Sequence, residues 1–548
     1  MAFENFCLLL QVHDELYIIT IMIQKNLLLI IVLLSTLTTS AQTLIDGIYY
    51  NLIPKMKQAE VTNVSGKYYK GDVEIPTSVT YEDVEYTVAS IKASAFLWCE
   101  DLTSVVIPNS VTTIGGSAFY KCTSLKNVTI GSGVTSIGED AFNGDLRLMN
   151  VFITDLEAWC NIEFGNQASN PMSYARYFRL NDEEMTKLNI PESVEKIGGF
   201  AFIGCSHFTS VTIPNTVTSI GQYAFERCSA LTSLSIPGSV TTIGNFAFNE
   251  CTNITSLTIS SGVESIGTYA FGSCKGVTSL ALPNSLKRIG DDAFAGCEGL
   301  TSITFGNGLY TIGSYAFLGC ISLSSANIPE GVTYIGKGAF SGCSAVSTVT
   351  LPSSTKELAA RAFAECPNLT EVYCYAEELP YTRDSWNWET TFIEDLFKDS
   401  YIESATLYVP ESAIDAYKEN ETWNGFGTIK TLSGEGPEEQ KCAAPAITYE
   451  GGILTFSCET EDVEYIYNMT PATAISGNGN NISAPTAYKV SVYATKSGYK
   501  DSDVVTKEIT VGSGAAGIRG DVNLDGTVNM PDAMFIVNKI LNGKFPDE

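Results

Sequence analysis

Apolar residues recur along the chain at a fixed interval of 23 residues, with polar residues between them. The phrase Ala-Phe marks each interval, and all steps are 23 residues except one of 60, which is 23 plus an insertion of 37. Self-similarity at such a period is typical of a solenoid, in which each repeat forms one coil. Its phenylalanines are Phe96, Phe119, Phe142, Phe202, Phe225, Phe248, Phe271, Phe294, Phe317, Phe340 and Phe363.

The pattern within one coil predicts two strands and a helical turn. Leu234 and Ile236 alternate with polar residues before a proline, which predicts a strand with one face inward. Ile243 marks a second, shorter extended piece. Phe248 and Cys251 are three residues apart, so one helical turn would place both side chains on the same side. No single coil buries its apolar face alone, so stability must come from stacking equivalent positions.

The repeat pattern "IGxxAFxxCxxLTSVTIPxSVTSIG" closely resembles the BspA-like leucine-rich repeats of bacterial surface proteins. The resemblance covers roughly residues 46–432 and includes the lead-in "DGIYYNL" and the ending "SATLYVPESAIDAYKENETWNGFGTI". It implies a β-rich repeat solenoid with short helical turns. Because family members are mostly described as adhesins or binders of host proteins, it also implies a binding function, although fold alone does not dictate function.

The solenoid divides into a cap, a repeat array and a second cap. We expect an N-terminal cap at residues 42–90, repeats at 91–370 with an insertion at about 146–185, and a C-terminal cap at 371–432. The irregular parts carry the aromatic residues that favour ligand contact, although aromatics in a cap also serve as core. These candidates are Trp159, Tyr174, Tyr177, Trp386 and Trp388.

The outward face of the main strand is a nearly uniform small-hydroxyl surface. Alternation places positions 8 and 10 after the repeat phenylalanine outward, and these are mostly Ser and Thr. Such residues suit any exposed sheet. They also lack the Tyr, Trp and Arg anchors typical of protein hot spots, so tight binding is expected at the irregular parts.

The regularly spaced cysteines predict packing rather than disulfides or a metal site. Equivalent residues of stacked coils point in parallel, which suits neither disulfide geometry nor four converging metal ligands. Asp145 occupies the cysteine slot in the coil that opens the insertion. We therefore expect free, buried thiols at Cys99, Cys122, Cys205, Cys228, Cys251, Cys274, Cys297, Cys320, Cys343 and Cys366.

Composition argues against nucleic acid and against most catalysis. The formal net charge of −29 disfavours a polyanionic partner. The chain has two histidines, His13 in the leader and His207 in a repeat, so a nucleophile with an imidazole base would depend on His207. A glycoside-acting enzyme built on paired carboxylates is the remote alternative, and it requires a pocket that the sequence does not indicate.

The first 41 residues read as a leader. Lys25, an apolar run over residues 27–34 and the small-residue exit Thr39-Ser40-Ala41 predict a signal peptide cut before Gln42, with a true start possible at Met22. A membrane anchor over residues 16–37 is the alternative, but polar residues 24–26 interrupt it. The chain is therefore expected to be secreted or held at a bacterial cell surface.

The C-terminal third divides into a linker, a β-rich module and a second linker. Residues 433–441 and 512–519 have linker composition. Alternating segments over 442–511 predict a small β-sandwich that resembles immunoglobulin-like spacers. A hairpin at Gly451-Gly452 would set Cys458 opposite Pro445, which leaves a disulfide between Cys442 and Cys458 open.

The tail at residues 520–548 carries hard oxygen ligands at calcium spacing. The stretch "DVNLDGTVNMPD" offers loop positions 1, 3, 5, 7, 9 and 12 with a glycine at 6, followed by an apolar helical face. It resembles one half of a dockerin, whereas dockerins normally carry two such segments. The resemblance implies one calcium ion and a possible cohesin-type partner. The predicted ligands are Asp521, Asn523, Asp525, Thr527, Asn529 and Asp532.

Two functions follow from these observations. The first is a non-catalytic exported repeat protein that binds a protein or glycan on its solenoid. The alternative is a component of an extracellular polysaccharide-degrading assembly, docked through the calcium segment.

Overall fold

The structure is a computed structural model that describes residues 42–383 and 395–432 and, in shorter pieces, 443–450, 453–458, 464–471, 476–478, 481–483, 487–495, 502 and 504–510. The predicted leader and the predicted calcium segment lie outside these residues. The chain divides into two compact units. The N-terminal unit is Met1–Ile254 with Tyr269–Phe271, and the C-terminal unit is Thr255–Thr268 with Gly272–Glu548.

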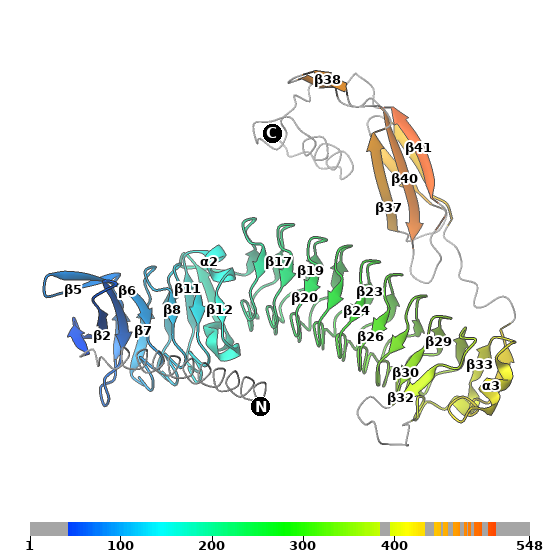
Figure 1. Ribbon diagram of the computed structural model, residues 1–548, viewed down its shortest axis with the longest axis horizontal. Coiled ribbons are helices and arrows are strands. Elements are labelled where there is room, and N and C mark those ends of the chain that lie inside the picture. Colours follow the sequence, from blue (N-terminus) through cyan, green and yellow to red (C-terminus); the bar gives the residue numbers. More distant parts are fainter. Residues whose placement is uncertain are drawn as a thin grey trace, which may run out of the picture. The chain divides into compact units, whose positions relative to one another are not determined.

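The N-terminal unit is a β-solenoid whose coils each add one strand to two sheets (Figure 1). One sheet contains β1 (Thr43–Ile45), β2 (Ile48–Ile53), β3 (Gln58–Thr62), β6 (Val84–Ile91), β8 (Thr113–Ile114), β10 (Ser136–Ile137) and β12 (Glu163–Phe164), with β5 (Ser78–Tyr81) paired to β6. The other contains β4 (Gly71–Glu74), β7 (Leu102–Val106), β9 (Asn127–Ile130), β11 (Asn150–Ile153), β13 (Tyr177–Leu180) and β14 (Glu183–Glu184).

Both sheets stop at the insertion, and new ladders begin after it. One new ladder pairs β15 (Lys187–Asn189) with β17 (Ser210–Thr212). The other joins β16 (Lys196–Ile197), β18 (Ser219–Ile220) and β20 (Thr242–Ile243), and β19 (Ser233–Ile236) lies between the last two in sequence. The short helices of the insertion are α2 (Leu156–Cys160), η1 (Gln167–Ser169) and η2 (Pro171–Ser173).

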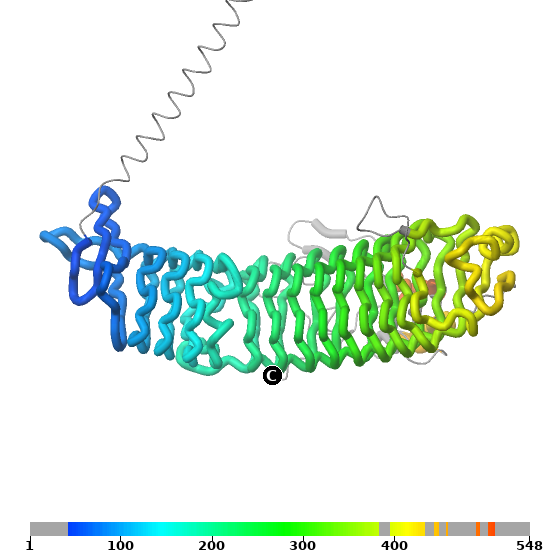
Figure 2. Tube along the Cα trace, turned by 90° about the horizontal axis from the view of Figure 1, so that it is seen from below, coloured from blue at the N-terminus to red at the C-terminus, as the bar shows by residue number. Residues whose placement is uncertain are grey.

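The C-terminal unit continues the same coil design, and Figure 2 shows its coils as parallel rungs. One ladder joins β22 (Ser265–Ile266), β24 (Arg288–Ile289), β26 (Thr311–Ile312), β28 (Tyr334–Ile335), β30 (Glu357–Ala359) and β32 (Tyr381–Arg383). The facing strands are β21 (Ser256–Ile259), β23 (Ser279–Ala281), β25 (Ser302–Thr304), β27 (Ser325–Asn327), β29 (Thr348–Leu351), β31 (Glu371–Cys374), β33 (Thr406–Val409) and β34 (Thr428–Thr431). η3 (Ile402–Ser404) and α3 (Ile414–Glu419) lie in the predicted C-terminal cap.

Stacked phenylalanine rings form the centre of each unit. In the N-terminal unit, Phe225 and Phe248 have ring centroids 5.1 Å apart and an interplanar angle of 2°. In the C-terminal unit, the rings of Phe317 and Phe340 are 5.1 Å apart. All four rings are fully buried, and burying one such side chain contributes about 1.5–3 kcal/mol. The predicted repeat solenoid is therefore confirmed.

The predicted helical turn around the repeat phenylalanine is wrong in its detail. Residues 245–250 form successive hydrogen-bonded turns, with the Cys251 N–H donating to the Phe248 carbonyl at 3.2 Å. Phe246 and Glu250 both lie in the left-handed region, with φ of 57° and 60°, so no helix continues through them. The predicted consequence still holds, because Phe248 and Cys251 both point into the core.

The insertion replaces one phenylalanine of the stack. The Phe119 N–H donates to the carbonyl of Ala141, which directly precedes the next phenylalanine of the stack. The Phe142 N–H donates in the same way to the Ala168 carbonyl, but the residue after Ala168 is Ser169. Ser169 therefore stands where the stack would have its next phenylalanine. A serine leaves much of the core space empty, and such a void would be costly. Insertion aromatics fill this space instead, as described below.

The ladder cysteines are confirmed as buried thiols that form no disulfide. Several thiols also donate a hydrogen bond to the phenylalanine carbonyl 26 residues earlier, for example Cys122 to Phe96 at 3.1 Å and Cys343 to Phe317 at 3.2 Å. The thiol therefore acts both as a small packing group and as a donor between neighbouring coils.

The described strands of residues 443–510 lie where the alternating pattern predicts them. β35 (Ala446–Glu450) and β36 (Ile453–Ser457) form a hairpin, and β37 (Glu464–Pro471), β40 (Ala487–Thr495) and β41 (Val505–Thr510) form a sheet, beside the small pair β38 (Ser476–Asn478) and β39 (Asn481–Ser483). Ala446 pairs with Ser457, which puts Cys458 opposite Pro445 as expected. The Cys458 thiol donates to the Ala443 carbonyl, whereas Cys442 lies outside the described residues.

We predict that the ten ladder thiols are inert in the folded protein. Burial raises the pKa of Cys99 to about 11 and that of Cys366 to about 12, so these two thiols form little thiolate near neutral pH. All ten ladder thiols are shielded from solvent. Titration with a disulfide reagent at pH 8 should leave them unmodified until guanidinium is added. Rapid modification of these thiols without loss of circular dichroism would contradict the prediction.

Asp145 is the polar exception in the cysteine column. Its side chain is fully buried, and one carboxyl oxygen accepts from the Cys122 N–H at 2.8 Å. The other oxygen has no hydrogen-bond partner. Burial, only partly offset by the Cys122 hydrogen bond, raises the pKa of this carboxyl from 3.8 to about 9, so it is protonated at neutral pH.

We predict that Asp145→Cys stabilises the protein above pH 4 and that the gain increases with pH. Because the folded pKa lies above the unfolded value, the stabilising contribution of Asp145 is complete below pH 4 and is lost as pH rises toward 9. The loss is at most about 1.4 kcal/mol per pH unit. Thermal unfolding midpoints of the two proteins at pH 5 and pH 8 measure it. Equal midpoint differences at both pH values would refute the proposed protonation.

Candidate functional site

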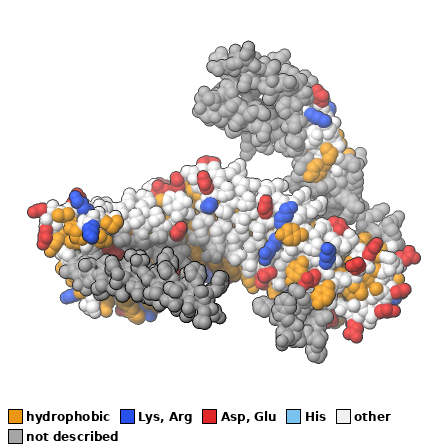
Figure 3. Space-filling model, viewed as in Figure 1, with side chains coloured by type: hydrophobic (Ala, Val, Ile, Leu, Met, Phe, Trp, Pro, Cys, Tyr) orange, Lys and Arg blue, Asp and Glu red, His pale blue; other side chains and the backbone are white. Residues whose placement is uncertain are grey.

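The outer face of the β7, β9, β11 and β13 strands departs from the small-hydroxyl pattern. Its first outward column runs in register through Ser104, Asn127, Asn150 and Tyr177. The corresponding outward positions in other coils are Lys187, Ser210, Ser233, Ser256, Ser279, Ser302, Ser325, Thr348 and Glu371. On the view in Figure 3, broad areas are white, as expected for small uncharged side chains. Larger polar groups therefore gather on the strands that border the insertion.

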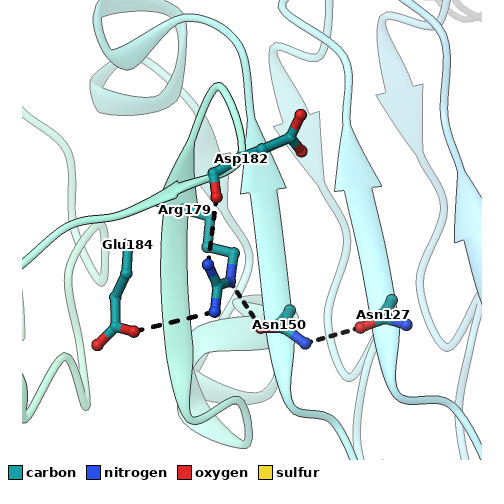
Figure 4. A network of polar contacts seen from close by, with 5 residues as sticks. All are labelled: Asn127, Asn150, Arg179, Asp182 and Glu184. Carbon is teal, nitrogen blue, oxygen red and sulfur yellow. Dashed lines mark hydrogen bonds and ion pairs between the residues drawn. The ribbon is translucent and has the colours of Figure 1, made fainter.

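A chain of hydrogen bonds runs across this face (Figure 4). The Arg179 Nε donates to Asn150 Oδ1 at 2.8 Å, and Asn150 Nδ2 donates to Asn127 Oδ1 at 2.8 Å. Arg179 also donates to the Asp182 carbonyl at 3.2 Å and lies 3.9 Å from a carboxylate oxygen of Glu184. Because Arg179 only donates, it fixes the orientation of both amides. The amide N–H groups of Asn127 consequently end the chain and are available to an acceptor.

Tyr177 lies at the centre of a cationic and aromatic group. The guanidinium carbons of Arg176 and Arg179 are 5.3 and 5.6 Å from the centre of its ring. The His207 ring, on the next coil, is 5.5 Å away. Arg179 also lies 6.0 Å from the Phe152 ring, in the neighbouring strand. We call Asn127, Asn150, Phe152, Arg176, Tyr177, Arg179 and His207 the Tyr177 cluster. It offers a planar ring, guanidinium donors and oriented amides on one sheet face.

The structure separates the predicted insertion aromatics into core and surface. Trp159 is 1% exposed, its ring lies 4.9 Å from Phe178, and its Nε1 donates to the Ala201 carbonyl at 2.8 Å. Together with Phe178 it occupies the space left by the missing phenylalanine of the stack, so it presents no surface to a ligand. Tyr174 is half-buried, with its hydroxyl 3.3 Å from Asn143 Oδ1.

Of the five predicted ligand-contacting aromatics, Tyr177 therefore has the clearest place on an outer face, where it is half-buried among polar groups. Trp386 and Trp388 lie outside the described residues. The same holds for the predicted calcium ligands Asp521, Asn523, Asp525, Thr527, Asn529 and Asp532.

A smaller aromatic group lies on the outer face of the C-terminal unit. Tyr373 and Tyr408 stack with ring centroids 4.6 Å apart, and Lys430 lies 5.8 Å from the centre of the Tyr408 ring. The Tyr373 hydroxyl contacts Glu371 at 3.2 Å. Burial and the neighbouring carboxylate raise the pKa of Tyr373 to about 12, so the hydroxyl stays protonated and can donate.

Neither face carries an arrangement for metal or membrane chemistry among the residues that the structure describes. Within them, no group of three His, Cys, Asp or Glu side chains could hold a metal ion. No helix in the same residues is long and apolar enough to cross a bilayer.

Sequence reasoning missed Asn150, Arg176 and Arg179 as site residues. One signal was present, because Asn127 already departs from serine in the first outward column. The insertion hid the others, since its residues have no assigned place in a 23-residue register. β13 restores that register by pairing Tyr177 with Asn150.

Comparisons with known proteins agree with this architecture. A family model described as the BspA type leucine-rich repeat region matches six copies, at residues 77–167, 175–278 and 264–379. No curated protein matches the chain.

Several solved structures are similar to this chain. A leucine-rich repeat protein from Bacteroides ovatus is 24% identical with a TM-score of 0.48, and the match covers 71% of this chain and 100% of the other. A leucine-rich cell surface protein from Faecalibacterium prausnitzii is 30% identical with a TM-score of 0.41, covering 60% and 94%. The pneumococcal vaccine antigen PcpA is 19% identical with a TM-score of 0.42, covering 72% and 99%.

The matched residues make up more than half of the 548 in the chain, and they coincide with the stacked coils described above. The chain belongs to the BspA-type leucine-rich repeat family.

Proposed function

We propose that the protein is an exported, non-catalytic repeat protein that binds a protein or glycan through the outer sheet face of its solenoid. The observation that carries this proposal is the Tyr177 cluster. Most other coils place serine or threonine at the corresponding outward positions, so the fold does not require an arginine-fixed amide chain there. Arginine and tyrosine are also the residues that dominate binding hot spots.

The remaining features fit a binding role at the outside of the cell. The apolar leader with its small-residue exit supports export, and the acidic composition disfavours nucleic acid as a partner. Repeat solenoids commonly present extended surfaces to partners. The immunoglobulin-like module proposed for residues 442–511 would then hold the solenoid away from its attachment point.

We predict that Tyr177→Ser and Arg179→Thr each weaken ligand binding at least about tenfold, the effect of losing about 1.4 kcal/mol. Both changes install residues common in the outward columns, so the coils should still form. Retention of the chain from residue 42 onward on immobilised matrix proteins and on a glycan array provides the measurement. Ser233→Ala, in the same column, is the matched control.

Two results would count against this assignment. Equal retention of the control and the two variants would remove the Tyr177 cluster from the binding surface. Lack of any retention of the unchanged protein on both panels would remove the binding function itself.

A second function is favoured by the segment "DVNLDGTVNMPD". Its side-chain oxygens at loop positions 1, 3, 5, 9 and 12, the Thr527 carbonyl at position 7 and the glycine at 6 support one calcium ion. A calcium-ordered segment of this kind would dock the protein, through a cohesin-type partner, into an extracellular polysaccharide-degrading assembly.

We predict that Asp521→Asn combined with Asp525→Asn abolishes calcium binding, because it removes two of the three carboxylates in the loop. Calorimetric titration with calcium should give one ion per unchanged chain and none for the double variant. Asp501→Asn, outside the loop, is the control. If calcium binds but cohesin modules capture the protein equally with and without chelator, the docking role is wrong.

A further inference from the structure

A pocket opens where the insertion interrupts the parallel ladder. Its volume is about 430 Å³, within the usual range for small-molecule sites. One wall is the chain from Cys160 to Phe164, and the other contains Lys196 and the segment 198–200, with Gln222 beside it. The Phe200 ring is backed by Tyr223, whose centroid lies 4.9 Å away in a stacked arrangement. The pocket is separate from the Tyr177 cluster in its lining residues.

The interruption leaves backbone groups without their usual partners. In neighbouring coils, the glycine after the short strand donates to the strand before it, as Gly138 donates to Ile114 and Gly221 donates to Ile197. The equivalent Gly198 N–H donates to the Cys160 carbonyl at 3.2 Å instead of to Phe164. Among the described residues, the Phe164 carbonyl therefore lacks the donor that this ladder normally supplies.

Both walls consequently present peptide groups to the pocket. The N–H groups of Glu163 and Gly165 donate to β10. Because successive residues of a strand direct their backbone groups to opposite sides, Phe164 directs its N–H and C=O away from β10, toward the pocket. β16 pairs with β18 through Ile197, so Lys196 directs its backbone groups toward the insertion. A ligand that carries both N–H and C=O groups, such as a peptide, matches these two edges.

Two opposite charges stand on these walls without pairing. Glu163 and Lys196 hold the same place in successive short strands, where most other coils carry serine or threonine and three carry Arg288, Tyr334 or Glu357. In continuous parts of the solenoid, opposite charges one coil apart do pair, as Arg227 and Glu250 do at 3.1 Å. Glu163 and Lys196 form no ion pair or side-chain hydrogen bond in the described part of the chain.

We propose that this pocket binds a short peptide of two or three residues with free termini. The Glu163 carboxylate receives the α-ammonium group, Lys196 receives the α-carboxylate, and the peptide groups between bond to the exposed backbone of Phe164 and Lys196. Phe164 and Phe200 contact the apolar part of the ligand. The Gly198–Cys160 hydrogen bond limits how far the pocket extends, which excludes a long strand.

The test uses tri-alanine as the probe and the chain from residue 42 onward, followed by calorimetry and ligand-observed NMR. Saturable binding is expected, with at least a tenfold loss of affinity for tri-alanine that is acetylated and amidated. Glu163→Ser and Lys196→Ser should each reduce affinity at least fivefold, and both install a residue type that other coils carry at this place. No saturation up to about 10 mM would overturn the proposal.

A matched pair of glycine variants tests the location. A side chain at residue 199 would run beside Gln222, with Cβ 3.3 Å from its Cγ, and would enter the pocket. Gly116 holds the same place in an uninterrupted coil, where an added Cβ lies 3.2 Å from the Glu139 carbonyl. Gly199→Gln should abolish tri-alanine binding, whereas Gly116→Gln should leave it unchanged.

Equal binding by both glycine variants would overturn the location. Equal binding of free and capped tri-alanine would overturn the role of Glu163 and Lys196. Because neither variant touches the Tyr177 cluster, these outcomes are independent of ligand retention on the outer face.

Discussion

The hydrogen bonds between successive coils are the constraint on which this structure depends. Each coil contributes only short strands, and two-residue pieces such as β8 have no stability of their own. They persist because each N–H finds a carbonyl one coil away, as in the bond from Gly138 to Ile114. The same regular spacing brings equivalent side chains together, so that phenylalanines stack and thiols reach the carbonyl of the coil before. Burial of the core and satisfaction of the backbone are therefore consequences of one repeat distance.

Because the coils are so regular, a residue that departs from the repeat pattern is informative. Because serine or threonine stands at most of the outward positions of the main strands, the fold gives no reason for an arginine that orients two asparagines. Asp145 is the internal counterpart, because a cysteine would fill the same slot without an unpartnered oxygen. These departures all lie in or beside the insertion. That segment breaks the ladders and so removes the neighbours that would otherwise pair such groups.

The sequence predicts the repeated parts of this fold well because one rule governs every coil. The period places Phe248 and Cys251 inward and identifies the outward columns without any knowledge of tertiary structure. The period does not show whether the chain around the repeat phenylalanine forms a helical turn or a series of turns with left-handed residues. Phe246 and Glu250 adopt the left-handed conformation, which their residue types rarely do, so the sequence gives no sign of it. Within the insertion, the period gives no register. The sequence alone therefore gives no reason to distinguish Trp159 from Tyr177. Trp159 lies in the core, whereas Tyr177 lies half-buried on the outer face.

The insertion places these two aromatics in different surroundings. Ser169 stands where the stack requires a phenylalanine, so a large ring must come from elsewhere in the insertion, and Trp159 supplies it while its Nε1 bonds to the Ala201 carbonyl. α2 packs into the core with Trp159 and Cys160 buried, and the Gly198 N–H donates to the Cys160 carbonyl beside the pocket that Phe164 lines. β13 meanwhile resumes the outer sheet and places Tyr177 beside Asn150. The insertion therefore contains both one wall of the pocket and the strand that alters the outer face.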